Sequence, residues 1–205
     1  MADKVRVAVL ISGRGSNMLA LSEYRRRDPD RAYEIVLVAS NVPAARGLVV
    51  AKRLGLKTWS RPHQGLAREA FDEALDAVLL EHRVELIALA GYMRLLSPGF
   101  VDKWRGRILN IHPSLLPLHK GLDTHQRAIM AGDEHGGCSV HLVTAELDSG
   151  EVLAQAKVRI LPRDDPESLA ARVLEAEHHL YPATLDAYAQ RLRDNRSHPG
   201  EGRDP

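Results

Sequence analysis

The segment Val5–Ile11 constrains the fold most, because its nearly continuous apolar run predicts a strand buried on both faces, as in a parallel sheet. A glycine-rich turn interrupts the run, and Met18–Arg27 then shows the apolar spacing of a helix. The same alternation is repeated along the first half of the chain. It predicts further strands at Tyr33–Ala39, Lys57–Ser60, Val84–Ala90 and Arg107–Ile111, and helices at Ala44–Leu54, Leu66–His82 and Pro98–Trp104.

The second half of the chain changes pattern, since Cys138–Val143 and Val152–Ile160 are typical of two strands with no long helix between them. A helix is expected before them at Gly121–Gly132. After them we expect a long helical stretch at Pro166–Arg193, broken or kinked at Tyr181-Pro182. The whole pattern predicts an α/β, Rossmann-like, open and mostly parallel sheet flanked by helices, with an antiparallel C-terminal addition. Sheets of this kind bind ligands at the carboxyl ends of their strands.

Neither an internal repeat nor a flexible linker divides the chain, so its 205 residues predict one domain over 1–194 and a polar, disordered tail over 195–205. The formal charge is only +1, which favours neither nucleic acid nor an acidic membrane surface as a partner. No apolar run approaches the roughly 20 residues that span a bilayer, and no signal peptide is recognisable before Val5. A lone Cys138 fits a reducing compartment. We expect a soluble, cytoplasmic protein.

The motif Asn110–Pro117 has the character of an active-site strand end. Side chains alternate along a strand, so Asn110 and His112 are predicted to share one face. Pro113 has no N–H to donate, and regular pairing should stop just after the histidine. An amide and an imidazole side by side can donate hydrogen bonds to an oxygen that becomes negative during a reaction. The alternative is a buried histidine with satisfied hydrogen bonds beside a turn asparagine.

The turn Gly13–Asn17 joins the first strand to the first helix. Consecutive backbone N–H groups at a helix start form an anion site, and glycine lets the chain turn sharply enough to expose them. Two known patterns are absent, because no Gly-Lys-Ser/Thr is present and Met18 stands where a dinucleotide fingerprint has glycine. The turn therefore favours a single sugar phosphate. The alternative is a plain turn with Ser16 or Asn17 as the helix cap.

Further polar residues follow near the antiparallel strands. Ser139 and His141 share a strand face, and Asp148 lies in the loop after that strand. A carboxylate that reaches His112 would favour the protonated imidazole, although Asp148 could instead only close an Asx turn. The histidines of this region, with Cys138 near, match no metal-ligand spacing, so no metal is expected.

Together these segments resemble the phosphoribosylglycinamide formyltransferases, the folate-dependent transformylases of purine synthesis. The similarity runs from about Val5 to about Tyr188. Its marks are Leu10–Asn17, Leu89–Pro98, Asn110–Pro117, Gly121–His125, Ser139–His141 and Glu146–Gly150. The Asn-x-His-Pro-Ser-Leu-Leu-Pro element alone is shared more widely, including with enzymes that formylate initiator methionyl-tRNA.

The resemblance implies a formyltransferase fold and a set of site residues. Asn110, His112 and Asp148 would be catalytic, supported by Ser139 and His141. Met93–Leu96 and Thr144–Asp148 would line the folate pocket, where Ala145 replaces an acidic residue common in relatives, and no contact is assigned to Arg14. The ribonucleotide would be bound by Gly15, Ser16, Asn17 and Glu177, and the folate by Arg68, Met93, Arg94, Leu95, Leu96, Asn110, Thr144, Ala145, Glu146, Leu147 and Asp148.

The implied reaction is direct attack of the substrate amine on the formyl carbon of 10-formyltetrahydrofolate, with no covalent enzyme intermediate. Asn110 and a protonated His112 would stabilise the oxygen, and Asp148 would keep His112 charged. The rivals are a tRNA formyltransferase, a formyltetrahydrofolate hydrolase and a non-enzymatic sugar-phosphate or metal-binding module. The expected partners are small molecules, the expected state is monomer or homodimer, and 117–135 is the candidate lid.

Overall fold

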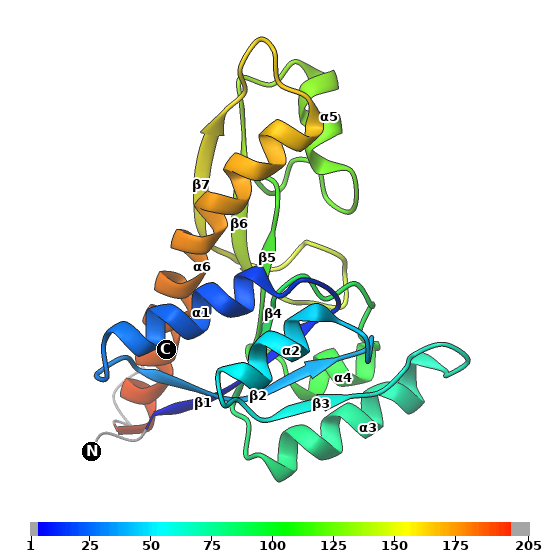
Figure 1. The fold of residues 1–205 in the computed structure, drawn as a ribbon, viewed down its shortest axis with the longest axis vertical. Helices are drawn as coiled ribbons and strands as arrows, with labels where there is room; N and C mark the ends of the chain where they lie inside the picture. Colours follow the sequence, from blue (N-terminus) through cyan, green and yellow to red (C-terminus); the bar gives the residue numbers. More distant parts are fainter. Residues whose placement is uncertain (1–3, 198–205) are drawn as a thin grey trace, which may run out of the picture.

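The computed structural model describes residues 4–197, which form one seven-stranded sheet with the order β3-β2-β1-β4-β5-β6-β7 (Figure 1). The strand pairs from β3 to β5 are parallel, whereas β6 pairs antiparallel with both β5 and β7. The predicted sheet with an antiparallel addition is confirmed. The strands are β1 Val5–Ile11, β2 Tyr33–Ser40, β3 Thr58–Ser60, β4 Leu86–Leu89, β5 Ile108–His112, β6 His135–Leu142 and β7 Val152–Arg159.

Helices cover both faces of the sheet and enclose two separate apolar layers. One layer holds α1, α2 and α6, the other α3 and α4. In β1, Val7 and Val9 face the first layer while Ala8 and Leu10 face the second, and all four are fully buried. The prediction of a strand covered on both faces is therefore confirmed. The helices are α1 Ser16–Arg27, α2 Arg46–Arg53, α3 Arg68–Glu81, α4 Pro98–Lys103, α5 Thr124–Ala131 and α6 Pro166–Ser197.

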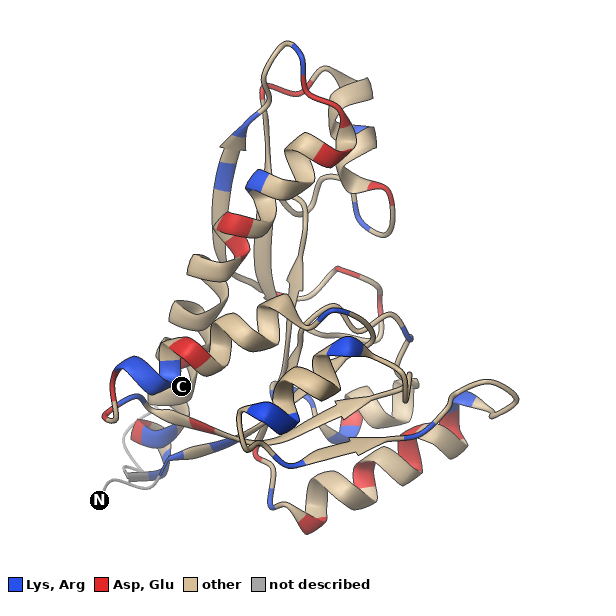
Figure 2. Ribbon diagram, viewed as in Figure 1, with Lys and Arg blue, Asp and Glu red and all other residues tan. Residues whose placement is uncertain are grey.

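The antiparallel addition extends away from the parallel part of the molecule, with α5 beside it and α6 running along its face (Figure 1). The register between β5 and β6 pairs Asn110 with His141 and His112 with Ser139. Polar residues of the two strands are thus brought directly opposite one another at the edge of the parallel sheet. Acidic and basic residues are interspersed over both parts of the described chain (Figure 2).

Helix α6 is the predicted long helical stretch, but it is not broken at Pro182. Tyr181 is fully buried, and its hydroxyl donates to the carbonyls of Leu89 (3.0 Å) and Leu109 (3.1 Å). This packing holds the helix together where proline removes one backbone hydrogen bond. The helix also continues past Asn195 to Ser197, so the predicted tail begins inside it, and 198–205 lie outside the described residues. None of the described helices combines the length and apolar character needed to cross a membrane.

Candidate active site

A cavity of about 730 Å³ lies at the carboxyl ends of the parallel strands. Its walls come from the loop after β4, the end of β5, the start of α5, the loop after β6 and the middle of α6. Asn110, His112 and Asp148 line it together with Asn17 and Glu177. The predicted catalytic residues therefore share one hollow with two of the predicted ribonucleotide residues, as ligand sites of open α/β sheets do.

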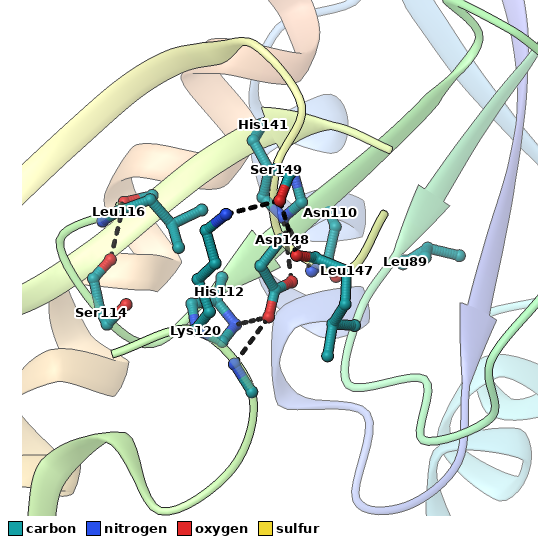
Figure 3. A network of polar contacts seen from close by, with 12 residues as sticks. Leu89, Asn110, His112, Ser114, Leu116, Lys120, His141, Leu147, Asp148 and Ser149 are labelled. Atoms are coloured by element: carbon teal, nitrogen blue, oxygen red, sulfur yellow. Dashed lines mark hydrogen bonds and ion pairs between the residues drawn. The ribbon is translucent and has the colours of Figure 1, made fainter. Parts of the chain in front are cut away.

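Four polar side chains from three parts of the sequence meet at the end of β5 (Figure 3). Asn110 Nδ2 lies 3.1 Å from His141 Nε2. Asp148 Oδ1 lies 3.5 Å from the same nitrogen, and Asp148 Oδ2 lies 3.4 Å from His112 Nδ1. Asp148 thus stands between the two histidines. The prediction that its carboxylate reaches His112 holds in the structure.

Asp148 is held in place by the main chain as well as by the histidines. Its backbone is left-handed (φ 48°), and Oδ2 accepts the Gly121 N–H at 2.9 Å. Burial by itself raises the pKa of this carboxyl. The hydrogen bonds from His141 and Gly121 and the charge of His112 outweigh burial, so the pKa is lowered from its usual value. Asp148 is therefore a permanent carboxylate at neutral pH.

His112 faces a hydrogen-bond acceptor on each ring nitrogen. Nδ1 faces Asp148, and Nε2 lies 3.1 Å from the carbonyl oxygen of His119. Burial nevertheless lowers the pKa of His112, and the His119 carbonyl and Asp148 only partly offset this effect. The expectation that Asp148 keeps His112 charged is thus corrected: desolvation outweighs the carboxylate when no further negative charge is near.

His119 is a residue that the sequence reasoning gave no role. Its backbone is left-handed (φ 52°), and its Nε2 lies 2.6 Å from Asp133 Oδ2. The side chain thus anchors the segment whose carbonyl contacts His112. Nothing in the spacing of the histidines indicates this contact, because it depends on how the segment folds back over β5.

The supporting residue Ser139 acts on the turn that follows the motif. Its hydroxyl donates to the Ser114 carbonyl (2.6 Å) and accepts from the Leu116 N–H (3.0 Å). Gln155 Nε2 donates both to Ser139 Oγ and to the Leu116 carbonyl, each at 2.8 Å. Ser139 and Gln155 therefore fix the turn just after His112. Gln155 was not predicted, since only the pairing of β6 with β7 places it there.

The glycine turn reaches the cavity through Asn17, whereas Gly15 and Ser16 are not part of the cavity wall. Gly15 precedes α1 with φ 77°, and a Cβ placed there would lie 2.8 Å from the Gly47 Cα. Neither Ser16 nor Asn17 caps the helix with its side chain, so the alternative reading as a simple cap is wrong. The N–H groups of the first turn of α1 remain available to an anion.

Asn17 contacts a buried carboxylate on α6. Its Nδ2 donates to Glu177 Oε2 at 2.7 Å, while its Oδ1 is buried without a hydrogen-bond partner among the described residues. Burial raises the pKa of Glu177, and the hydrogen bond from Asn17 offsets this only in part. Both side chains line the cavity and have bonding capacity that a polar ligand can use.

The predicted folate residues divide into two groups. Met93, Leu95 and Leu147 line the cavity although each is more than half exposed, and Arg94 lies between them. Apolar side chains at a cavity mouth suit a flat, partly apolar ligand. A second group is not part of the cavity wall. It comprises Arg68 at the exposed start of α3, the half-buried Leu96, and the exposed residues Thr144, Ala145 and Glu146 of the loop after β6.

Among residues 4–197, no cluster of three or more His, Cys, Asp or Glu side chains has the geometry of a metal site. Buried Cys138 has a pKa raised to about 12 by desolvation, so its thiol is not an activated nucleophile. The chemistry available at the cavity is that of an amide, two imidazoles and a carboxylate.

Comparisons with known proteins define the class. Residues 5–185 match the model of the formyl transferase family. Phosphoribosylglycinamide formyltransferase of Haemophilus influenzae is 41% identical over 93% of this chain and 91% of its own length. The crystal structure of the Brucella melitensis protein of that name has 49% identity and a TM-score of 0.86, covering 91% of this chain and 96% of the other. The chain belongs to the formyl transferase family, and within it to the phosphoribosylglycinamide formyltransferases.

Longer relatives carry the same unit as one part. The chicken trifunctional purine biosynthetic protein adenosine-3 is 48% identical over 91% of this chain, which spans 19% of that protein. The human protein of that name gives 44% identity over 91% of the chain. The chain thus covers about a fifth or less of these trifunctional relatives.

Proposed function

We propose that the protein transfers the formyl group of 10-formyltetrahydrofolate to the amine of 5'-phosphoribosylglycinamide. The products are 5'-phosphoribosyl-N-formylglycinamide and tetrahydrofolate, as a step of purine (IMP) biosynthesis. The observation that carries the proposal is the meeting of Asn110, His112 and Asp148 in a cavity that the glycine-turn side chain Asn17 also lines. Names of relatives support the choice of substrates.

The ribonucleotide occupies the side of the cavity next to α1. The backbone N–H groups of Gly15, Ser16 and Asn17 bind its phosphate at the positive end of the helix. Glu177 accepts hydrogen bonds from the ribose hydroxyls, which supply the donors that its buried carboxylate lacks. The glycinamide amine then extends toward the end of β5.

The folate occupies the side formed by the loop after β4 and the loop before Asp148. Met93, Leu95 and Leu147 cover the pterin, and the main chain of these loops provides its hydrogen bonds. Leu96 and the exposed residues Thr144, Ala145 and Glu146 shape the loops that hold it, and Arg68 lies near the outer end of the folate.

The reaction begins when the nitrogen of the neutral amine forms a bond to the formyl carbon. The electrons of the C=O double bond move to the oxygen, which becomes an alkoxide. Asn110 donates an N–H to this oxygen. His112 also donates to it, and this hydrogen bond replaces the contact between His112 Nδ1 and Asp148 Oδ2, which are 3.4 Å apart in the structure. The negative oxygen favours the imidazolium and so offsets the burial that lowers the pKa of His112.

The proton of the attacking amine leaves toward Asp148, directly or through a water molecule. The C=O bond then re-forms, the bond from carbon to N10 of the folate breaks, and N10 takes up a proton. No covalent enzyme intermediate and no metal is needed. We further propose a cytoplasmic monomer or homodimer whose partners are its two small substrates, with no nucleic acid or membrane involved, in keeping with a charge of +1.

The decisive experiment is a formyl-transfer assay with 10-formyltetrahydrofolate and three acceptors in parallel: the ribonucleotide, water and initiator methionyl-tRNA. We expect turnover with the ribonucleotide alone, and the same rate after chelator treatment. Turnover with water or tRNA and none with the ribonucleotide would replace the proposal by one of its rivals. Absence of all turnover, with metal in the purified protein, would favour a binding module.

A further inference from the structure

Ser12 bonds to the cavity-lining loop 91–95 and belongs to no predicted site. It directly follows β1 and precedes the glycine turn. Its backbone N–H donates to the Gly91 carbonyl at 3.1 Å, and its hydroxyl accepts the Met93 N–H at 2.7 Å. One residue thus makes two hydrogen bonds to the loop 91–95 that lines the cavity.

The hydroxyl of Ser12 is oriented by a buried partner. It donates to Asn41 Oδ1 at 2.6 Å, and Asn41 is only 2% exposed. Asn41 in turn has its Nδ2 3.1 Å from His63 Nδ1. Because the hydroxyl proton points at Asn41, the oxygen lone pairs are available to the Met93 N–H. The contact is therefore fixed by the fold rather than by a freely rotating hydroxyl.

The loop 91–95 has few other anchors. Met93 is 70% exposed and Leu95 is 55% exposed, so packing does not hold their backbone. Arg94 supplies the second anchor, since its Nη2 donates to the Ala67 carbonyl at 3.3 Å and its guanidinium lies over the ring of Phe71. Loss of the Ser12 hydroxyl would leave the inner end of the loop held by the Gly91 carbonyl and by Tyr92, which packs against the core, with no hydrogen bond to the main chain at Met93.

We propose that Ser12 is a positioning residue for the formyl donor: through its hydroxyl it fixes the main chain at Met93 in the place where the folate binds. The inference rests on the proposed function, because it assigns loop 91–95 to the folate side. Ser12 acts through the loop and touches no reacting atom. A loosened loop should weaken binding of the donor and leave the ribonucleotide side unchanged.

The test compares Ser12→Ala with the wild-type protein in KM for each substrate and in the Kd for tetrahydrofolate by calorimetry. We expect the donor KM and the tetrahydrofolate Kd to rise roughly three- to tenfold, the usual cost of one hydrogen bond. The ribonucleotide KM should change less than twofold. Ser12→Thr keeps the hydroxyl and should restore both donor values.

Ser40→Ala is the matched control. Ser40 ends the neighbouring strand β2, is 1% exposed, and bonds through its hydroxyl to the main chain of Val42 rather than to loop 91–95. It should leave both KM values unchanged. If Asn41 acts through Ser12, adding Asn41→Ala to Ser12→Ala should raise the donor KM little further.

An unchanged donor KM in Ser12→Ala, an equal rise for both substrates, or no rescue by Ser12→Thr would overturn the inference. The Kd for tetrahydrofolate tests the role of Ser12 independently of the proposed function. A wild-type protein that binds tetrahydrofolate without formyl transfer would overturn the proposed function, and the Ser12 comparison would still be decided by Kd. A wild-type protein that binds no tetrahydrofolate would overturn both.

Discussion

The two sides of the cavity work by different physical means. On the glycine-turn side, ligand-binding capacity comes from backbone N–H groups at the start of α1 and from one buried carboxylate, Glu177. On the other side it comes from side chains that contact one another, with Asp148 between His112 and His141. The first side depends on backbone shape, and the second on mutual electrostatics.

This difference determines how each side responds to change. Among Asn110, His112, His141 and Asp148, removing one side chain alters the hydrogen bonds of the others, because they are in contact. Removing Asp148 also alters the pKa of His112. The glycine turn has no such coupling, so a change there acts through sterics and stays local. Substitutions on the two sides should therefore differ in how far their effects spread.

Asp148→Asn should lower kcat by roughly 10²–10⁴, the usual contribution of a positioned acid–base group, with ribonucleotide affinity nearly intact. The carboxylate raises the pKa of His112, so its loss should move that pKa still further below the usual value. NMR titration of the His112 ring protons checks the sign. A rise in that pKa, or a collapse of nucleotide binding, would show that Asp148 has a structural role instead.

Asn110→Ala should lower kcat by roughly 10²–10³, the cost of losing one donor to a developing oxyanion. KM for either substrate should change little, because the hydrogen bond strengthens only as the oxygen becomes charged. Steady-state kinetics measures both. Near-normal turnover would remove Asn110 from this role.

Gly15→Ala should weaken ribonucleotide binding roughly tenfold and lower Tm. A side chain at φ 77° costs roughly 1–2 kcal/mol, and the added Cβ lies 2.8 Å from the Gly47 Cα, which cannot move aside. Calorimetry and thermal unfolding measure the two effects. Gly13→Ala is the matched control, since its Cβ meets no atom within 4 Å, and it should keep the wild-type Tm. Equal behaviour of the two variants would contradict the steric argument.

Glu177→Gln should weaken ribonucleotide binding several-fold while raising Tm slightly at neutral pH. The pKa of Glu177 is raised, so the folded protein bears the cost of an ionised buried carboxylate above that pKa. Glutamine removes the charge and keeps an oxygen for Asn17. The gain in Tm should shrink as the pH falls toward the pKa of the carboxyl. Glu175→Gln, on the exposed face of α6, is the control and should leave Tm unchanged. A gain in Tm of Glu177→Gln that stays the same at all pH values would contradict this account.

Much of the fold followed from local pattern. The strand Val5–Ile11 has the predicted bounds, and the helices and strands of the first half lie within a few residues of their predicted limits. Apolar runs, helical spacing and glycines at turns reflect local backbone geometry and side-chain periodicity. Both depend on residues that are close in the sequence. For the same reason the shared face of Asn110 and His112 was predictable from one strand.

Other features were decided only by the tertiary structure. Asp148 reaches His112 because β6 pairs with β5, and Ser12 reaches Met93, 81 positions away, because β4 pairs with β1. Helix α6 stays unbroken at Pro182 because Tyr181 is buried against the sheet. The pKa of His112 falls because burial outweighs its carboxylate partner. Sequence pattern determined which residues have the chemistry, whereas strand order and burial decided which of them meet and in what charge state, since both are properties of the packed chain.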